Sequence, residues 1–140
     1  MLRNLLLLFI ALNFNDSNAA SNRIFVSNEY GNSVTVIDAN SNTVIKSISL
    51  GKRPRGIGLS PDKTELYVAI SGDNQIAVID TQSLQVIRKF KSGDDPEAFA
   101  VHPNGNLYIS NEEDAKASVY DPKTGVLLAE IEVGIEPEGV

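Results

Sequence analysis

The chain has 140 residues, of which 42% are hydrophobic and 21% charged, an ordinary balance for a globular protein rather than a disordered one. Its formal net charge is −6 and its pI is about 4.7, so most of its surface would repel phosphate backbones and nucleic acid is not an expected partner. The chain has no cysteine, which excludes disulfides, thiolate metal sites and cysteine nucleophiles.

The first predicted element is a secretion signal at residues 1–19. Arg3 is its only positive residue, and an apolar run of eight residues, Leu5–Leu12, follows. A bilayer-spanning helix needs about 20 apolar residues, whereas a run of this length suits the core of a signal peptide. Ser17 and Ala19 fit the small-x-small cleavage pattern, so we expect cleavage after Ala19. The alternative is a buried N-terminal helix. We expect a periplasmic or secreted mature chain with no membrane span after signal removal.

Residues 20–140 repeat with a period of about 42 residues, which indicates a repeat architecture. Three kinds of residue recur with spacings of 42 and then 41: Asp38, Asp80 and Asp121; Gly51, Gly93 and Gly134; Pro54, Pro96 and Pro137. The predicted units are residues 23–51, 52–93 and 94–134, and residues 135–140 start a further unit.

Each complete unit reads as four short strands rich in β-branched residues and bounded by turn residues. In the second unit the predicted strands are Gly56–Ser60, Glu65–Ile70, Gln75–Asp80 and Gln85–Phe90. The first unit begins on its second strand, at Arg23. Four strands per unit of this length predict an all-β fold, a β-propeller with four-stranded antiparallel blades, of which about three are present. A β-sandwich is the alternative.

Glycine and alanine alternate with larger residues in the first predicted strand of two units. "GIGLS" carries Gly56 and Gly58, and "AFAVH" carries Ala98 and Ala100. Blades converge toward the axis of a propeller, so the innermost strand has the least room. The small residues therefore indicate that this strand is the innermost one.

"FVSNEYGNSVTVID" and "YVAISGDNQIAVID", with the G-x-x-P and "SPD" motifs that follow, resemble the YVTN-type β-propeller repeat. "GKRPRGIGLSPD", "SGDDPEAFAVHPNG" and "VGIEPEGV" are similar to turns of its PQQ-dependent catabolism-associated β-propeller subgroup. The resemblance implies a periplasmic protein, a seven-bladed ring and an association with quinone-dependent alcohol catabolism. It does not imply that this chain binds PQQ, and we predict no cofactor. Since about three blades cannot close a ring, we expect a fragment of a longer protein; assembly of several short chains is the alternative.

The strand order predicts that two sets of loops share one face, around the mouth of the channel. The first set comprises Lys52–Arg55, Asp94–Glu97 and Ile135–Glu138, and the second comprises Asn28–Ser33, Ser71–Asn74 and Asn111–Lys116. The opposite face receives "SPDK", "HPNG" and the hairpins led by aspartate. Binding or chemistry is expected at the first face.

Arg53 and Arg55 are the leading candidates for a ligand-binding site, together with Glu97 and Glu138. The arginines flank Pro54, at positions where the other units carry acidic residues. Two guanidiniums on a rigid turn could hold a carboxylate or a phosphate, which predicts a small anionic ligand or an unidentified periplasmic protein as partner. The alternative is that the arginines pair with neighbouring glutamates in a structural ring of ion pairs.

Other polar residues offer weaker signals. The acidic side chains of these loops could bind a hard cation, but no EF-hand-like spacing is present, so we favour a solvated acidic rim and predict no metal site; these residues are Asp94, Asp95, Glu97, Glu112, Glu113 and Glu138. His102, the single histidine, precedes Pro103 in a turn of the opposite face, and we predict no catalytic residue. The favoured function is a binding or scaffold module. A propeller hydrolase or lactonase and a cell-surface adhesion repeat are the alternatives.

Overall fold

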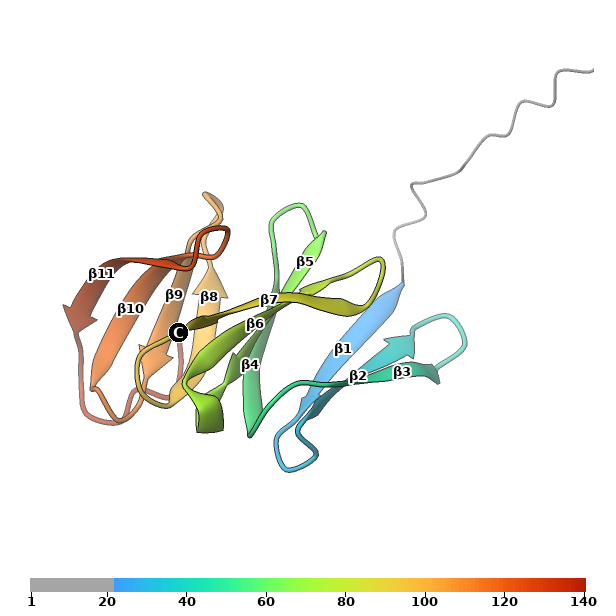
Figure 1. Cartoon of the computed structure of the whole chain (residues 1–140), viewed down its shortest axis with the longest axis horizontal. Coiled ribbons are helices and arrows are strands. Elements are labelled where there is room, and N and C mark those ends of the chain that lie inside the picture. Colours follow the sequence, from blue (N-terminus) through green and yellow to red (C-terminus); the bar gives the residue numbers. More distant parts are fainter. Residues whose placement is uncertain (1–21) are drawn as a thin grey trace, which may run out of the picture.

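The computed structural model describes residues 22–140, which fold into three antiparallel sheets arranged side by side (Figure 1). The predicted signal peptide, residues 1–19, lies outside the described residues. Apart from one turn of 3₁₀ helix at Ser71–Asp73, all the regular secondary structure of these residues is β-strand. The predicted all-β fold with antiparallel propeller blades is confirmed.

The sheets contain three, four and four strands in sequence order. The first sheet is β1 (Arg23–Asn28), β2 (Ser33–Asp38) and β3 (Thr43–Ser49). The second is β4 (Pro54–Leu59), β5 (Glu65–Ile70), β6 (Gln75–Asp80) and β7 (Gln85–Lys91). The third is β8 (Pro96–Val101), β9 (Leu107–Asn111), β10 (Lys116–Asp121) and β11 (Val126–Glu132).

The first strand of the second blade differs from its predicted bounds. It begins at Pro54 rather than Gly56, and a bulge separates the pairing of Pro54 from that of Ile57. Proline lacks an amide hydrogen, so it is tolerated at the first position of a strand or beside a bulge. The two arginines around Pro54 therefore lie on or next to the innermost strand itself.

The middle sheet is buried on both faces because a neighbouring sheet covers each. Leu66 and Val68 of β5 belong to the core shared with the first sheet. Tyr67 and Ala69, which alternate with them, belong to the core shared with the third sheet. All four side chains are at most 2% exposed. Successive side chains of a strand point to opposite faces of the sheet, so β5 contributes to both cores. This explains why its sequence is an almost uninterrupted apolar run.

The innermost strands of the second and third blades, β4 and β8, lie side by side (Figure 1). A Cβ atom on Gly56 would lie 2.7 Å from the carbonyl oxygen of Glu97 and 2.9 Å from the Cα of Ala98. A Cβ on Gly58 would lie 3.1 Å from the ring of Phe99. The two glycines predicted on the innermost strand of the second blade, Gly56 and Gly58, are therefore required by the contact between blades.

Aspartates that recur in the repeat close the hairpins at the other ends of the strands. Asp38 Oδ1 accepts hydrogen bonds from the backbone N–H groups of Asn40 and Ser41, at 2.8 and 3.0 Å. Asp80 Oδ1 accepts hydrogen bonds from the hydroxyl and the backbone N–H of Ser83, at 2.7 and 2.6 Å, and Asp121 accepts one from the backbone N–H of Lys123 at 2.9 Å. These bonds hold the pKa of each carboxyl below its ordinary value. The repeated aspartate is thus a turn residue.

The outer edge of the third sheet is open among the described residues. β11 is exposed along its whole length, and Leu128 and Ile131 are 51% and 46% exposed.

No helix within residues 22–140 is long and apolar enough to cross a membrane.

We predict that Gly56→Ala lowers the free energy of unfolding by about 1–3 kcal/mol, because the added methyl group meets backbone that cannot move aside. Gly58→Ala should cost less, since a phenylalanine ring can shift. Urea unfolding followed by circular dichroism measures both. Gly139→Ala, where a Cβ meets nothing within 4 Å, is the control. Equal effects at Gly56 and Gly139 would contradict the close contact between blades.

We predict that part of the stability depends on Asp62 and disappears in strong acid. Hydrogen bonds from the Ser60 hydroxyl and then from Thr64 lower the pKa of Asp62 to about 2. The folded-state pKa lies below the unfolded value of about 3.9, so the ionised carboxylate stabilises the fold above pH 4. This contribution is lost as the pH falls through 2. The difference in Tm between the parent and Asp62→Ala should therefore narrow between pH 5 and pH 2; a constant difference would refute the prediction.

Candidate functional site

The structure brings the two predicted sets of loops together on one face. In the second blade the N–H groups of Ser71 and Gly72 donate to the carbonyl oxygens of Arg53 and Lys52, each at 3.0 Å. In the third blade the N–H of Glu112 donates to the carbonyl of Asp95 at 3.0 Å. The loop between the second and third strands therefore holds the segment that enters the innermost strand.

The residue before each repeated proline adopts a left-handed backbone. Its φ is 57° at Arg53, 49° at Asp95 and 52° at Glu136. Arg53 and Asp95 are each held by an asparagine of the preceding blade. Asn32 Oδ1 accepts the N–H of Arg53 at 3.1 Å, and Asn74 Oδ1 accepts the N–H of Asp95 at 3.0 Å. A non-glycine residue in this region is strained, and such strain persists only where surrounding contacts impose it. The backbone that carries these side chains is therefore held firmly.

Six charged side chains from three blades form what we call the cross-blade charge cluster. Its members are Glu29, Arg53, Arg55, Asp95, Glu97 and Glu112. Glu29 comes from the loop between β1 and β2, the arginines from the entry to β4, and the other acids from the third blade. The cluster spans both boundaries between blades.

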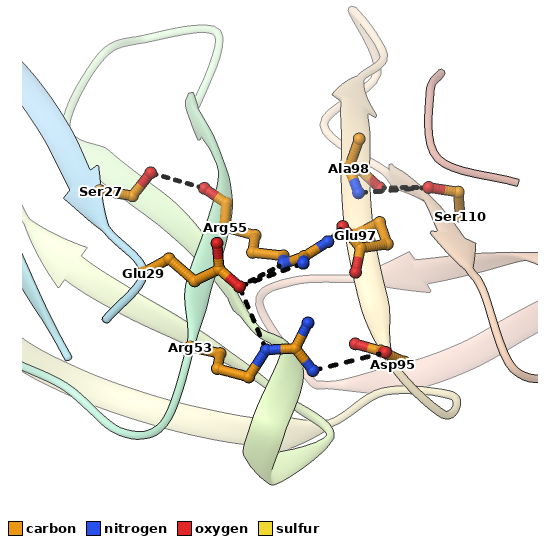
Figure 2. A network of polar contacts seen from close by, with 8 residues as sticks. All are labelled: Ser27, Glu29, Arg53, Arg55, Asp95, Glu97, Ala98 and Ser110. Carbon is orange, nitrogen blue, oxygen red and sulfur yellow. Dashed lines mark hydrogen bonds and ion pairs between the residues drawn. The ribbon is translucent and has the colours of Figure 1, made fainter. Parts of the chain in front are cut away.

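Glu29 binds both arginines through a single oxygen (Figure 2). Its Oε1 lies 3.2 Å from Nε of Arg53 and 3.1 Å from Nη2 of Arg55. The hydrogen bonds from Arg53 and then Arg55 hold the pKa of Glu29 below its ordinary value. Glu29 therefore stays ionised and ties the first blade to the second.

Arg55 reaches in the other direction to Glu97 of the third blade, and Nη1 forms a close ion pair with Oε2. The Glu97 side chain is only 6% exposed, whereas that of Arg55 is 29% exposed. Burial raises the pKa of Glu97, the ion pair with Arg55 opposes this, and the neighbouring Glu112 raises it further. The pKa of Arg55 is itself raised, chiefly by Glu97. Arg55 therefore compensates for the burial of the Glu97 carboxylate.

Arg53 is held more loosely than Arg55. Its Nη1 lies 3.7 Å from Oδ2 of Asp95, and its side chain is 41% exposed. Figure 2 shows both guanidiniums between Glu29 on one side and the third-blade acids on the other. Of the two arginines, Arg53 has the guanidinium that an incoming group can reach more readily.

Of the four predicted site residues, the structure brings together Arg53, Arg55 and Glu97. Glu138 is exposed beyond β11 and forms no ion pair within residues 22–140. Whether the assembled residues bind a ligand stays a prediction. The ion pairs expected under the alternative interpretation are present, and they engage both arginines.

Glu29 is the member of the cluster that sequence reasoning did not single out. A signal for it exists in the repeat, because Glu29, Ser71 and Glu112 occupy equivalent positions at spacings of 42 and 41. Two of these three positions are glutamate, in a loop already expected on the binding face. The sequence places Glu29 in the loop set Asn28–Ser33 of this face, but nothing local marks its side chain as reaching the next blade.

His102 lies apart from the cluster, in the turn between β8 and β9. Its Nδ1 accepts the N–H of Asn104 at 3.2 Å, and its ring lies beside that of Tyr108, with 5.9 Å between the ring centroids. A cavity of about 450 Å³ also lies on this side, lined by turn residues of the second and third blades that include Asp62, Asn104 and Asp121. The hydrogen bond to Asn104 and the ring contact with Tyr108 give His102 a structural role.

The fold and parts of the sequence match known proteins. The sequence profile of YNCE-like β-propellers matches residues 11–140. Among solved structures, hydrazine synthase of Kuenenia stuttgartiensis is similar over 84% of this chain, with a TM-score of 0.78 and 26% identity. Dihydro-heme d1 dehydrogenase NirN in complex with DHE is similar over 79%, with a TM-score of 0.68 and 21% identity, which shows the fold alone. This chain covers 34% and 24% of those two chains. A search of curated proteins finds no match.

We predict that Arg55→Met is more destabilising than Arg53→Met. Removing Arg55 leaves Glu97 buried without its cation, which should lower the free energy of unfolding by about 1–3 kcal/mol. Arg53 makes longer, more exposed contacts, so its removal should cost less than about 1 kcal/mol. Urea unfolding at neutral pH measures the difference. Equal losses for the two variants would show that Glu97 does not depend on Arg55.

Proposed function

Because the chain belongs to the YNCE-like β-propeller family, we propose that it acts as a binding or scaffold module. The cross-blade charge cluster supports this proposal. It gathers acidic and basic side chains on the face where propellers commonly bind ligands, and its backbone is fixed from the neighbouring blades. Its members are two arginines and four acids, a set suited to recognising charge rather than to nucleophilic catalysis.

The ligand that this face fits best carries an anionic group, which would contact Arg53. The single observation that carries this proposal is the exposure of Arg53, at 41%, together with its long 3.7 Å contact to Asp95. A carboxylate or phosphate that replaces this contact gains a guanidinium without breaking the closer pair between Arg55 and Glu97. Arg55 would then stabilise the contact between blades, and Arg53 would bind the ligand.

The cellular setting is part of the proposal. The signal pattern in residues 1–19 supports export to the periplasm or secretion. The resemblance to PQQ-dependent catabolism-associated propellers supports a role beside quinone-dependent alcohol oxidation, in which this protein binds an anionic ligand or a periplasmic partner rather than the quinone.

The experiment is calorimetric titration of the full-length protein with simple anions, namely citrate, succinate and inorganic phosphate. We expect at least one to bind, and Arg53→Gln to weaken it at least about tenfold, which corresponds to losing one charged hydrogen bond. Lys52→Gln is the matched control, since Lys52 is an exposed neighbouring cation.

Two results would count against the proposal. If none of the anions binds, the face does not recognise this chemistry. If Arg53→Gln binds as tightly as the parent and Lys52→Gln, the anion binds elsewhere.

A further inference from the structure

Three carboxylates of the third blade converge at the edge of the cross-blade charge cluster. Asp95, Glu97 and Glu112 each offer an oxygen, and these oxygens lie within 4.8 Å of one another. The hydrogen bond from Glu112 N–H to the Asp95 carbonyl holds the two contributing segments together at 3.0 Å. The three acids are thus grouped by the backbone, not by the chance approach of long side chains.

Glu97 adds an independent observation, because it is buried and half of its carboxylate is unpartnered. Its side chain is 94% buried, given an exposure of 6%. Oε2 pairs with Arg55, whereas the buried Oε1 has no hydrogen-bond partner among the described residues. In Figure 2 one oxygen of Glu97 lies beside the guanidinium and the other is directed toward Asp95. Oδ1 of Asp95 is likewise buried and without a partner. Buried oxygens of this kind call for a donor or a cation.

The charges of the cluster point to a cation rather than to a further donor. Four carboxylates face two guanidiniums, and each guanidinium is shared between Glu29 and one acid of the third blade, Arg53 with Asp95 and Arg55 with Glu97. The cluster therefore holds two more negative charges than positive ones when all its members are ionised. Carboxylates this close together repel one another strongly in a partly buried place. One divalent cation would balance the charge.

We propose that Asp95, Glu97 and Glu112 bind a Ca²⁺ ion. Carboxylate oxygens are the ligands of hard cations, and Ca²⁺ takes them at about 2.3–2.6 Å, so two on opposite sides lie about 4.6–5.2 Å apart. The separations in the cluster, up to 4.8 Å, already suit that ion. Mg²⁺ would draw opposite oxygens to about 4.0–4.2 Å and demands stricter geometry. Arg55 holds Glu97 in place through its other oxygen, Oε2, without contacting the ion itself.

The test is calorimetric titration of the full-length protein with CaCl₂ at constant ionic strength. One Ca²⁺ should bind per chain, with a dissociation constant of about 10⁻⁴–10⁻³ M, the range of extracellular modules. Glu112→Gln should weaken binding at least about tenfold, and Asp95→Asn provides a second variant in case the first does not fold. Glu113→Gln is the matched control, since Glu113 is the exposed neighbour of Glu112. The Tm should rise with CaCl₂ in the parent but not in Glu112→Gln.

The proposal is overturned if the parent does not bind Ca²⁺. It is also overturned if Glu113→Gln weakens Ca²⁺ binding as much as Glu112→Gln does, because equal effects would indicate binding to a diffuse acidic surface. Tighter binding of MgCl₂ than of CaCl₂ would overturn the choice of ion. The titration contains no organic anion, so its outcome is separate from that of the anion-binding experiment above.

Discussion

The close approach of β4 and β8 at Gly56 positions both the core between the second and third blades and the charged face above it. At this point the backbones of two blades pass so near that a Cβ would lie 2.7 Å from a carbonyl oxygen. This contact sets the distance between the second and third sheets, and hence the space that Tyr67, Ile109 and the rest of their shared core must fill. A repeat without a small residue here would have to separate its blades.

The same contact determines the electrostatics of the binding face. Arg55 precedes Gly56, and Glu97 is its equivalent one repeat later, so strands that touch at Gly56 place these two side chains against each other. A repeat with identical residues at this position would set like charges side by side. The exchange of arginine for glutamate between units relieves that repulsion at one boundary. It leaves an excess of acid in the third blade, where Asp95, Glu97 and Glu112 meet.

Much of the fold was predictable because the period of the sequence is also the period of the structure. The second and third strands of the middle blade, Glu65–Ile70 and Gln75–Asp80, have their predicted bounds. The site was less predictable. Arg53, Arg55 and Glu97 stand out as departures between units, but Glu29 reaches the arginines across 24 and 26 residues of chain. The burial of Glu97 depends on the packing between sheets, and no local pattern reports it.

Arg55 and Glu97 join neighbouring blades as a coupled pair. A double-mutant cycle with Arg55→Gln, Glu97→Gln and the combined variant, followed by urea unfolding at neutral pH, measures that coupling directly. Coupling of about 1–3 kcal/mol is expected, so that the second substitution costs much less once the first has been made. Losses that simply add would mean that the two side chains stabilise the fold independently and do not act as a pair.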